Sequence, residues 1–254
     1  MTESARLART LFAPLFFLTA VSVAYAGLDF GKALDAVVDA SKAATLSDQD
    51  VKSMASQFRQ STDRKNRLAP ASDTYAQRLA RITGGIATED GMKLDYKVYL
   101  SKTVNAFALA DGTIRVYSGL MDLMSDDEVR FVIGHEIGHV KLGHSRASIQ
   151  TAYAASAARK GLAASASGKV SSIAESDLGE LAERVVNAQH SQGQESSADA
   201  YSVKFMQKHK YESRAAASAL RKLAKLSGNE ASILSSHPSP GGRADAVEKT
   251  AAQK

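Results

Sequence analysis

One ten-residue stretch, residues 134 to 143, contains two histidines four positions apart and a glutamate directly after the first. Four residues of an α-helix turn through about 400°, so His135 and His139 project from one face and can bind one metal ion. Glu136 lies about 100° around the helix from His135, where it can accept a proton from an attacking water without ligating the metal. This pattern is typical of zinc-dependent hydrolases.

The residues around this motif favour a helix. Ser125 is a suitable N-cap, and Glu128 three residues later completes a capping box. Gly143 can end the helix. Gly134 and Gly138 have no side chain, which allows another backbone to approach the helix closely. Apolar residues follow the cap at helical spacing: Val129, Val132, Ile133, Ile137 and Val140. This context disfavours the alternative that the motif is two surface histidines on an ordinary amphipathic helix.

A catalytic zinc site usually needs a third protein ligand and leaves the fourth position to water. A third histidine six residues after His139 is excluded, because that position is Ser145. The other known arrangement uses a glutamate on a later helix, followed four residues on by an acid that hydrogen-bonds a ligating histidine. Of the glutamates after His139, only Glu195 has an acid at that offset, namely Asp199. The alternative for this pair is an exposed acidic surface.

The N-terminal residues resemble an export signal. Arg6 and Arg9 precede an almost entirely apolar run, residues 11 to 23, and a small-x-small cleavage site at 24 to 26. We expect residues 1–26 to be a signal peptide and the mature chain, 27–254, to be periplasmic. An uncleaved anchor is the alternative. The chain has no cysteine, which excludes lipobox acylation, thiolate ligands and disulfides.

The composition limits the kinds of molecule that the chain is expected to bind. The 254-residue chain has 32 Lys and Arg against 27 Asp and Glu, so its net charge is +5. These charges are spread along the chain and there is no Trp, so we expect no nucleic-acid partner. Weak attraction to anionic lipid is compatible with peripheral association with the outer or inner membrane. The mature length suits one domain.

The mature chain is predicted to have a helical N-terminal part, residues 27–67, and a catalytic core, residues 68–254. The hydrophobic period changes to two from Met92, which predicts strands at about 94–98, 105–109 and 114–117, with a turn at Asp111 and Gly112. We therefore expect a small antiparallel sheet just before the metal helix. An extended substrate could add to its free edge as another strand.

The segments that follow the motif leave alternatives open. Residues 145–177 are rich in Ala and Ser, and form either a gate over the site or an ordinary surface helix and loop. His237 and Arg243 lie in a Pro- and Gly-rich segment and could donate to an oxyanion. Alternatively, His237 could fill the fourth metal position and keep the enzyme latent. Spacing alone favours a surface loop over either role.

The remaining histidines, His144, His190 and His209, are interpreted as ordinary exposed or packing residues, because none shares a helical face with the predicted ligands.

Four separate motifs occur in order between about Leu68 and Arg243. They are the Asn-Ala-Phe-Ala sequence at 105–108 with the following Ser-Gly-Leu at 118–120, His-Glu-Ile-Gly-His at 135–139, Gln-Glu-x-x-Ala-Asp at 194–199, and Ser-His-Pro at 236–238 with Arg243. In these motifs the chain resembles the bacterial periplasmic metalloproteases of the LoiP and BepA type. These proteases are relatives of the CAAX prenyl protease and of the mitochondrial inner-membrane stress protease.

The resemblance implies an α+β, mainly α, zincin fold of the gluzincin kind, with a small sheet beside the metal helix. It implies one zinc ion bound by His135, His139 and Glu195, with Glu136 as the general base. It also implies that Asp199 supports a ligand and that His237 and Arg243 act near the site as regulatory or transition-state groups.

The function implied by the resemblance is cell-envelope quality control by cleavage of unfolded or misfolded proteins. The chain departs from the family pattern in having neither a lipoprotein cysteine nor a tetratricopeptide tail. The sequence therefore predicts an exported zinc endopeptidase. Two alternatives are an envelope chaperone or assembly factor with structural zinc, and an exopeptidase that trims termini.

Overall fold

The computed structural model describes residues 46–160, 175–226, 233–238 and 240–252. The predicted signal peptide, the rest of the chain before residue 46, and residues 161–174 of the Ala- and Ser-rich segment lie outside these ranges. No helix within the described ranges is long and apolar enough to cross a lipid bilayer.

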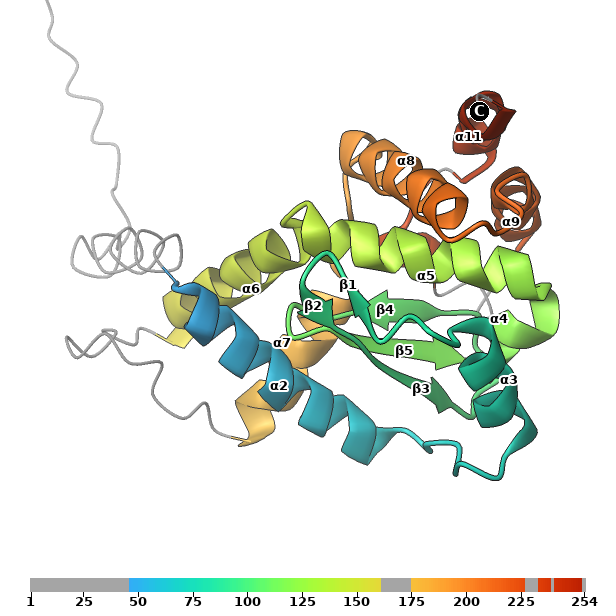
Figure 1. Cartoon of the computed structure of the whole chain (residues 1–254). Helices are drawn as coiled ribbons and strands as arrows, with labels where there is room; N and C mark the ends of the chain where they lie inside the picture. Colours follow the sequence, from blue (N-terminus) through green and yellow to red (C-terminus); the bar gives the residue numbers. More distant parts are fainter. Residues whose placement is uncertain (1–45, 161–174, 227–232, 239, 253–254) are drawn as a thin grey trace, which may run out of the picture.

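Within the described ranges the protein is mainly helical, as predicted, and contains two small sheets where one was predicted. The described helices are α2 (Asp48–Lys65), α3 (Thr74–Ile82), α4 (Ser118–Leu123), α5 (Asp126–Lys141), α6 (His144–Lys160), α7 (Glu175–Val186), α8 (Gln192–Lys208), α9 (Ala215–Leu223), α10 (Ile233–Ser236) and α11 (Pro240–Ala252). The described strands are β1 (Thr88–Glu89), β2 (Met92–Lys93), β3 (Asp95–Tyr99), β4 (Ala106–Ala108) and β5 (Thr113–Tyr117). Helix α5 lies between the larger sheet on one side and α8 and α9 on the other (Figure 1).

The larger sheet has the strand order β3-β5-β4 and is mixed, so the prediction of an antiparallel sheet is wrong for one pairing. Strands β4 and β5 form the expected antiparallel hairpin, whose turn contains Gly112 with a φ of 88°. Strand β3, however, pairs in parallel with β5. The residues between β3 and β4 carry no tight-turn signal, so nothing local directs those consecutive strands to pair. The smaller sheet is a β1-β2 hairpin that the sequence analysis missed.

Alternate residues of the larger sheet face two different hydrophobic clusters. Ile114 and Val116 belong to the cluster that includes residues of α5, α8 and α9. Tyr99, Phe107 and Leu109 belong to the cluster that includes residues of α2, α6 and α7. Because successive strand residues point to opposite faces, the short sheet separates the two layers of helices.

Arg115 links the sheet to α2. Its side chain on β5 is fully buried, and its guanidinium donates to both carboxylate oxygens of Asp63 on α2 at 2.9 and 3.0 Å. It also donates to Asp95 at 3.0 Å, and Tyr99 donates to Asp63 at 2.6 Å. Burial acts to raise the pKa of Asp63, but the hydrogen bonds from Arg115 and Tyr99 outweigh it and hold the pKa below the ordinary value.

We expect Asp63→Asn to lower the free energy of unfolding by about 3 kcal/mol, because it leaves a buried guanidinium without its main counter-charge. The matched control is Asp95→Asn, which removes an exposed partner of the same guanidinium and should cost less than about 1 kcal/mol. Urea unfolding of the two variants measures the difference.

The same substitution should change the pH dependence of stability. A carboxylate with a lowered pKa stabilises the fold above its unfolded pKa, and that contribution is lost as the pH falls through the folded pKa. The loss of stability on acidification below about pH 4 should therefore be shallower in Asp63→Asn than in the unmodified chain. Equal losses of unfolding free energy in Asp63→Asn and Asp95→Asn would contradict this account.

Candidate metal centre

Helix α5 carries the predicted motif, and its caps are those the sequence predicts. The Ser125 side chain accepts from the Glu128 N–H, and the Glu128 carboxylate accepts from the Ser125 N–H. The helix ends at Lys141, and Gly143 follows with a left-handed φ of 80°. The motif residues His135, Glu136 and His139 are all buried.

Helix α8 carries Glu195 and Asp199, and both side chains are buried. It packs closely against α5 because α5 has glycine where the two helices meet. A Cβ at Gly134 would lie 2.6 Å from Oγ of Ser202, and a Cβ at Gly138 would lie 3.2 Å from Cα of Ala198. The expectation that these glycines permit a close approach is therefore confirmed, and the alternative of an exposed acidic pair is wrong.

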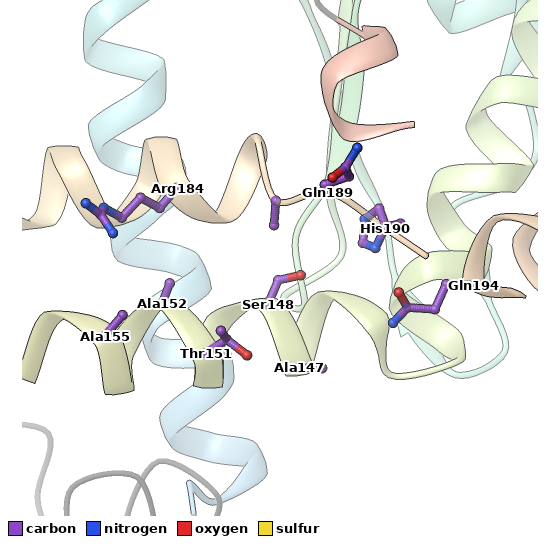
Figure 2. Close-up of a pocket in the computed structure, with 10 residues that line it drawn as sticks. Ala147, Ser148, Thr151, Ala152, Ala155, Arg184, Gln189, His190 and Gln194 are labelled. Atoms are coloured by element: carbon purple, nitrogen blue, oxygen red, sulfur yellow. The ribbon is translucent and has the colours of Figure 1, made fainter. Parts of the chain in front are cut away.

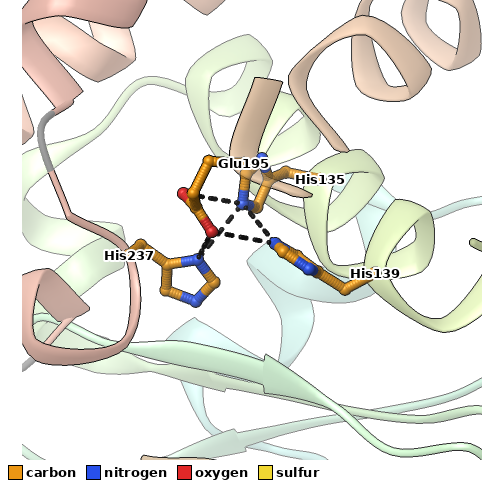
Figure 3. Close-up of side chains that lie close together, drawn as sticks. All are labelled: His135, His139, Glu195 and His237. Atoms are coloured by element: carbon orange, nitrogen blue, oxygen red, sulfur yellow. Dashed lines mark hydrogen bonds and ion pairs between the residues drawn. The ribbon is translucent and has the colours of Figure 1, made fainter. Parts of the chain in front are cut away.

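Helices α5 and α8 bring His135, His139 and Glu195 to one point, where His237, which directly follows α10, joins them (Figure 3). Their potential ligand atoms all lie within 4.8 Å of one another. Glu195 Oε1 is 3.2 Å from His139 Nε2, and Glu195 Oε2 is 3.7 Å from His135 Nε2. His237 Nδ1 is 3.0 Å from Glu195 Oε1.

This donor set fits a divalent metal. Burial lowers the pKa of His135 well below its ordinary value and that of His139 to about 2. Both rings are therefore held in the neutral form, which is the form that ligates a metal. A buried carboxylate and neutral imidazoles are borderline ligands that suit first-row divalent ions.

Glu136 is buried beside this set. Burial raises the pKa of Glu136, which the Ala108 backbone N–H partly opposes by donating to the carboxylate. The Oε1 atom of Glu136 has no hydrogen-bond partner among the described residues, although His237 Nε2 lies 3.4 Å away. Because a buried oxygen of this kind normally has a partner, Glu136 Oε1 would be available to accept from an attacking water if His135, His139 and Glu195 held a metal.

Asp199 and Arg243 contact two of the predicted ligands, His135 and Glu195. Asp199 Oδ1 is 2.9 Å from His135 Nδ1, which orients the other ring nitrogen, Nε2, toward Glu195. Burial raises the pKa of Asp199 to about 7, and the nearby His237 partly opposes this rise. Nε of Arg243 lies 2.9 Å from Asp199 Oδ2. Arg243 also forms an ion pair with Glu195.

The interpretation of His237 and Arg243 as parts of a surface loop is wrong. Both side chains are buried, and Arg243 lies in the first turn of α11, which starts at Pro240. Proline suits the first position of a helix because its φ is already helical and that position needs no N–H. The Pro- and Gly-rich composition therefore marks a helix start.

His144 and His190, interpreted from the sequence as ordinary exposed or packing residues, both contact the predicted ligand His139. His144 Nδ1 lies 3.0 Å from His139 Nδ1, and the His190 ring stacks on the His139 ring at 3.9 Å. Reasoning from one continuous helix missed His144 because the chain turns at Gly143 before α6 begins. A usable signal was present: His144 follows His139 by five residues and His190 precedes Glu195 by five.

We expect His144→Ala to weaken binding of Zn²⁺ by about 10-fold or more. With His139 Nε2 turned toward the ligand set, Nδ1 carries the proton and donates to His144, and loss of such a partner typically costs 10- to 100-fold in metal affinity. Competition with a chelator measures the affinity. His209→Ala is the control, because His209 binds Glu89 instead. Equal affinities in the two variants would contradict this role.

Comparisons with known proteins agree with this geometry. Residues 73–251 match Peptidase family M48. The chain is 44% identical over 222 residues to Metalloprotease LoiP of Escherichia coli (strain K12), an alignment covering 87% of this chain and 88% of LoiP. It is 42% identical over 214 residues to Metalloprotease YcaL of the same organism, covering 84% of each chain. The chain therefore belongs to peptidase family M48 and is a metalloendopeptidase of the LoiP type.

Proposed function

We propose that the protein is a zinc-dependent endopeptidase of the bacterial cell envelope that hydrolyses peptide bonds in misfolded or envelope proteins. The observation that carries the proposal is the convergence of His135, His139 and Glu195 next to Glu136, whose buried Oε1 has no partner among the described residues. Membership of the family supports the peptidase activity. The basic, apolar and small-residue pattern at the N-terminus supports export to the periplasm.

Zinc is the metal that the donor set favours. Two imidazoles and one carboxylate match the ligands of known catalytic zinc sites, and the chain has no cysteine to replace them. A bound zinc ion would supply Lewis-acid chemistry, polarising the scissile carbonyl and lowering the pKa of an attacking water.

Glu136 is the proposed general base. It accepts the proton of the attacking water and passes it to the leaving amine. The burial that raises the pKa of Glu136 also brings its proton affinity closer to that of water activated by a metal, which favours transfer.

His237 and Arg243 differ in what they can do. His237 Nδ1 lies within the ligand set, which supports its role as a further metal ligand that keeps the enzyme latent. Its Nε2 near Glu136 supports the other role, donation to the oxyanion, once substrate displaces the ring. Arg243 contacts the carboxylates of Glu195 and Asp199, so we assign it as a positioning residue.

Strand β4 is the proposed docking edge for substrate. It is an edge strand of the larger sheet, and its neighbours Asn105 and Leu109 are hydrogen-bonded to β5. Backbone groups alternate in direction along a strand, so those of Ala106 and Ala108 point away from β5. The Ala108 backbone N–H already donates to Glu136. This contact supports passage of the substrate backbone between β4 and the general base.

The function is tested with the zinc-loaded full chain and an unfolded protein substrate. Glu136→Gln with matched zinc content should cut about 10² to 10⁴ times more slowly than the unmodified chain, because the base is lost while the metal is kept. Mass spectrometry of the fragments gives the cut sites, and internal cuts support an endopeptidase. Equal activity in the two proteins would overturn the proposal.

Ala106→Pro should raise the Michaelis constant or abolish cleavage while zinc content stays unchanged. Among the described residues, the Ala106 N–H donates to the Asn105 side chain and not to β5, so the β4–β5 ladder is kept while the docking edge loses a donor. Ala106→Ser keeps the N–H and is the control. Unchanged kinetics in the proline variant would refute docking on this edge.

A further inference from the structure

A groove of about 450 Å³ runs between α6 and the segment that joins α7 to α8 (Figure 2). Arg184 lies at one end and His190 at the other. Its walls consist of alanines and of the polar side chains Ser148, Thr151, Gln189 and Gln194. We call it the α6 groove.

The α6 groove begins at the metal centre. His190, which lines it, stacks on the ligand His139 at 3.9 Å with the two rings 26° apart in tilt. Gln194, on the same wall, directly precedes the ligand Glu195. Two residues that line the groove therefore directly adjoin residues that would hold the metal, one by stacking and one in sequence.

Strand β4, the proposed docking strand, contributes to the same buried cluster as α6. Strand β4 is followed by Leu109, which shares one buried cluster with Ile149 and Ala152 of α6. Ala152 also lines the groove. The proposed docking strand and the α6 groove are therefore linked through one buried cluster.

The length of the groove suits a short stretch of peptide. Its wall on α6 runs from Ala147 to Ala155, eight residues apart, which corresponds to about 12 Å of helix. An extended chain advances about 3.3 to 3.4 Å per residue, so about three or four residues fit between the metal centre and Arg184.

The lining indicates what the groove recognises. Its alanines leave space for substrate side chains, its amides and hydroxyls can pair with a peptide backbone, and none of the described residues that line it is Asp or Glu. Arg184, the arginine among these described residues, is 3.1 Å from Glu180, but both side chains are exposed. Ion pairs of this kind are weak, so a substrate carboxylate can exchange with Glu180.

We propose that the α6 groove is a substrate subsite, which binds three or four residues on one side of the scissile bond and selects Asp or Glu opposite Arg184. This inference rests on the proposed function.

The test is cleavage of a mixed peptide library by the zinc-loaded full chain, with cut sites read by mass spectrometry. The unmodified chain should enrich Asp and Glu at the third or fourth residue on one side of the cut. Arg184→Glu should reverse this, changing the ratio of acidic to basic residues at that position by at least about 10-fold. Arg221→Glu is the control, because Arg221 is also exposed and paired with carboxylates but lies outside the groove.

A steric variant tests the groove independently of charge. Thr151 is exposed in the middle of the α6 wall, so Thr151→Trp should slow cleavage of long peptides while sparing peptides too short to reach it. Cleavage by the unmodified chain without a positional preference, or the same preference in Arg184→Glu, would overturn the subsite and leave the proposed function standing. Absence of any cleavage by the unmodified chain would overturn both.

Discussion

The packing of α5 against α8 is the contact on which the metal centre depends. His135 and His139 come from one helix and Glu195 from the other, so the ligand atoms meet only if the two helix axes are close. Gly134 and Gly138 permit that distance, since a Cβ at either position would press on α8. Large side chains at such a contact would increase the distance between the helix axes and separate the ligands.

The packing of α5 against α8 also buries the carboxylates of Glu195 and Asp199, which explains why charged and polar side chains surround them. Glu195 and Asp199 are almost completely inaccessible to solvent, and a buried carboxylate is costly unless it is paired. Arg243 of α11 contacts both, and His135 shares Asp199 with it. The same groups that compensate this cost hold the ligands in position. Removing one of them should therefore disturb both stability and metal affinity.

Much of the fold and site could be predicted because the signals are local. The capping box at Ser125, the stop at Gly143 and the four-residue spacing of His135 and His139 each depend only on residues within one turn or helix. Pairing Glu195 with Asp199 also needed only a helical offset. Strand pairing could not be predicted in this way, because β3 has no tight turn to β4 and instead pairs in parallel with β5.

The sequence by itself determined the chemistry: which residue types are present, their spacing on each helix, and hence a metal-dependent hydrolase. Only the tertiary structure decided which distant residues join them. His190, distant in sequence, stacks on His139, and His144 contacts His139 from beyond the turn at Gly143. Arg243 pairs with Glu195 from a helix whose composition had suggested a loop. These contacts join different segments of the chain, and a side-chain period describes one helix at a time. The packing of the helices therefore sets them.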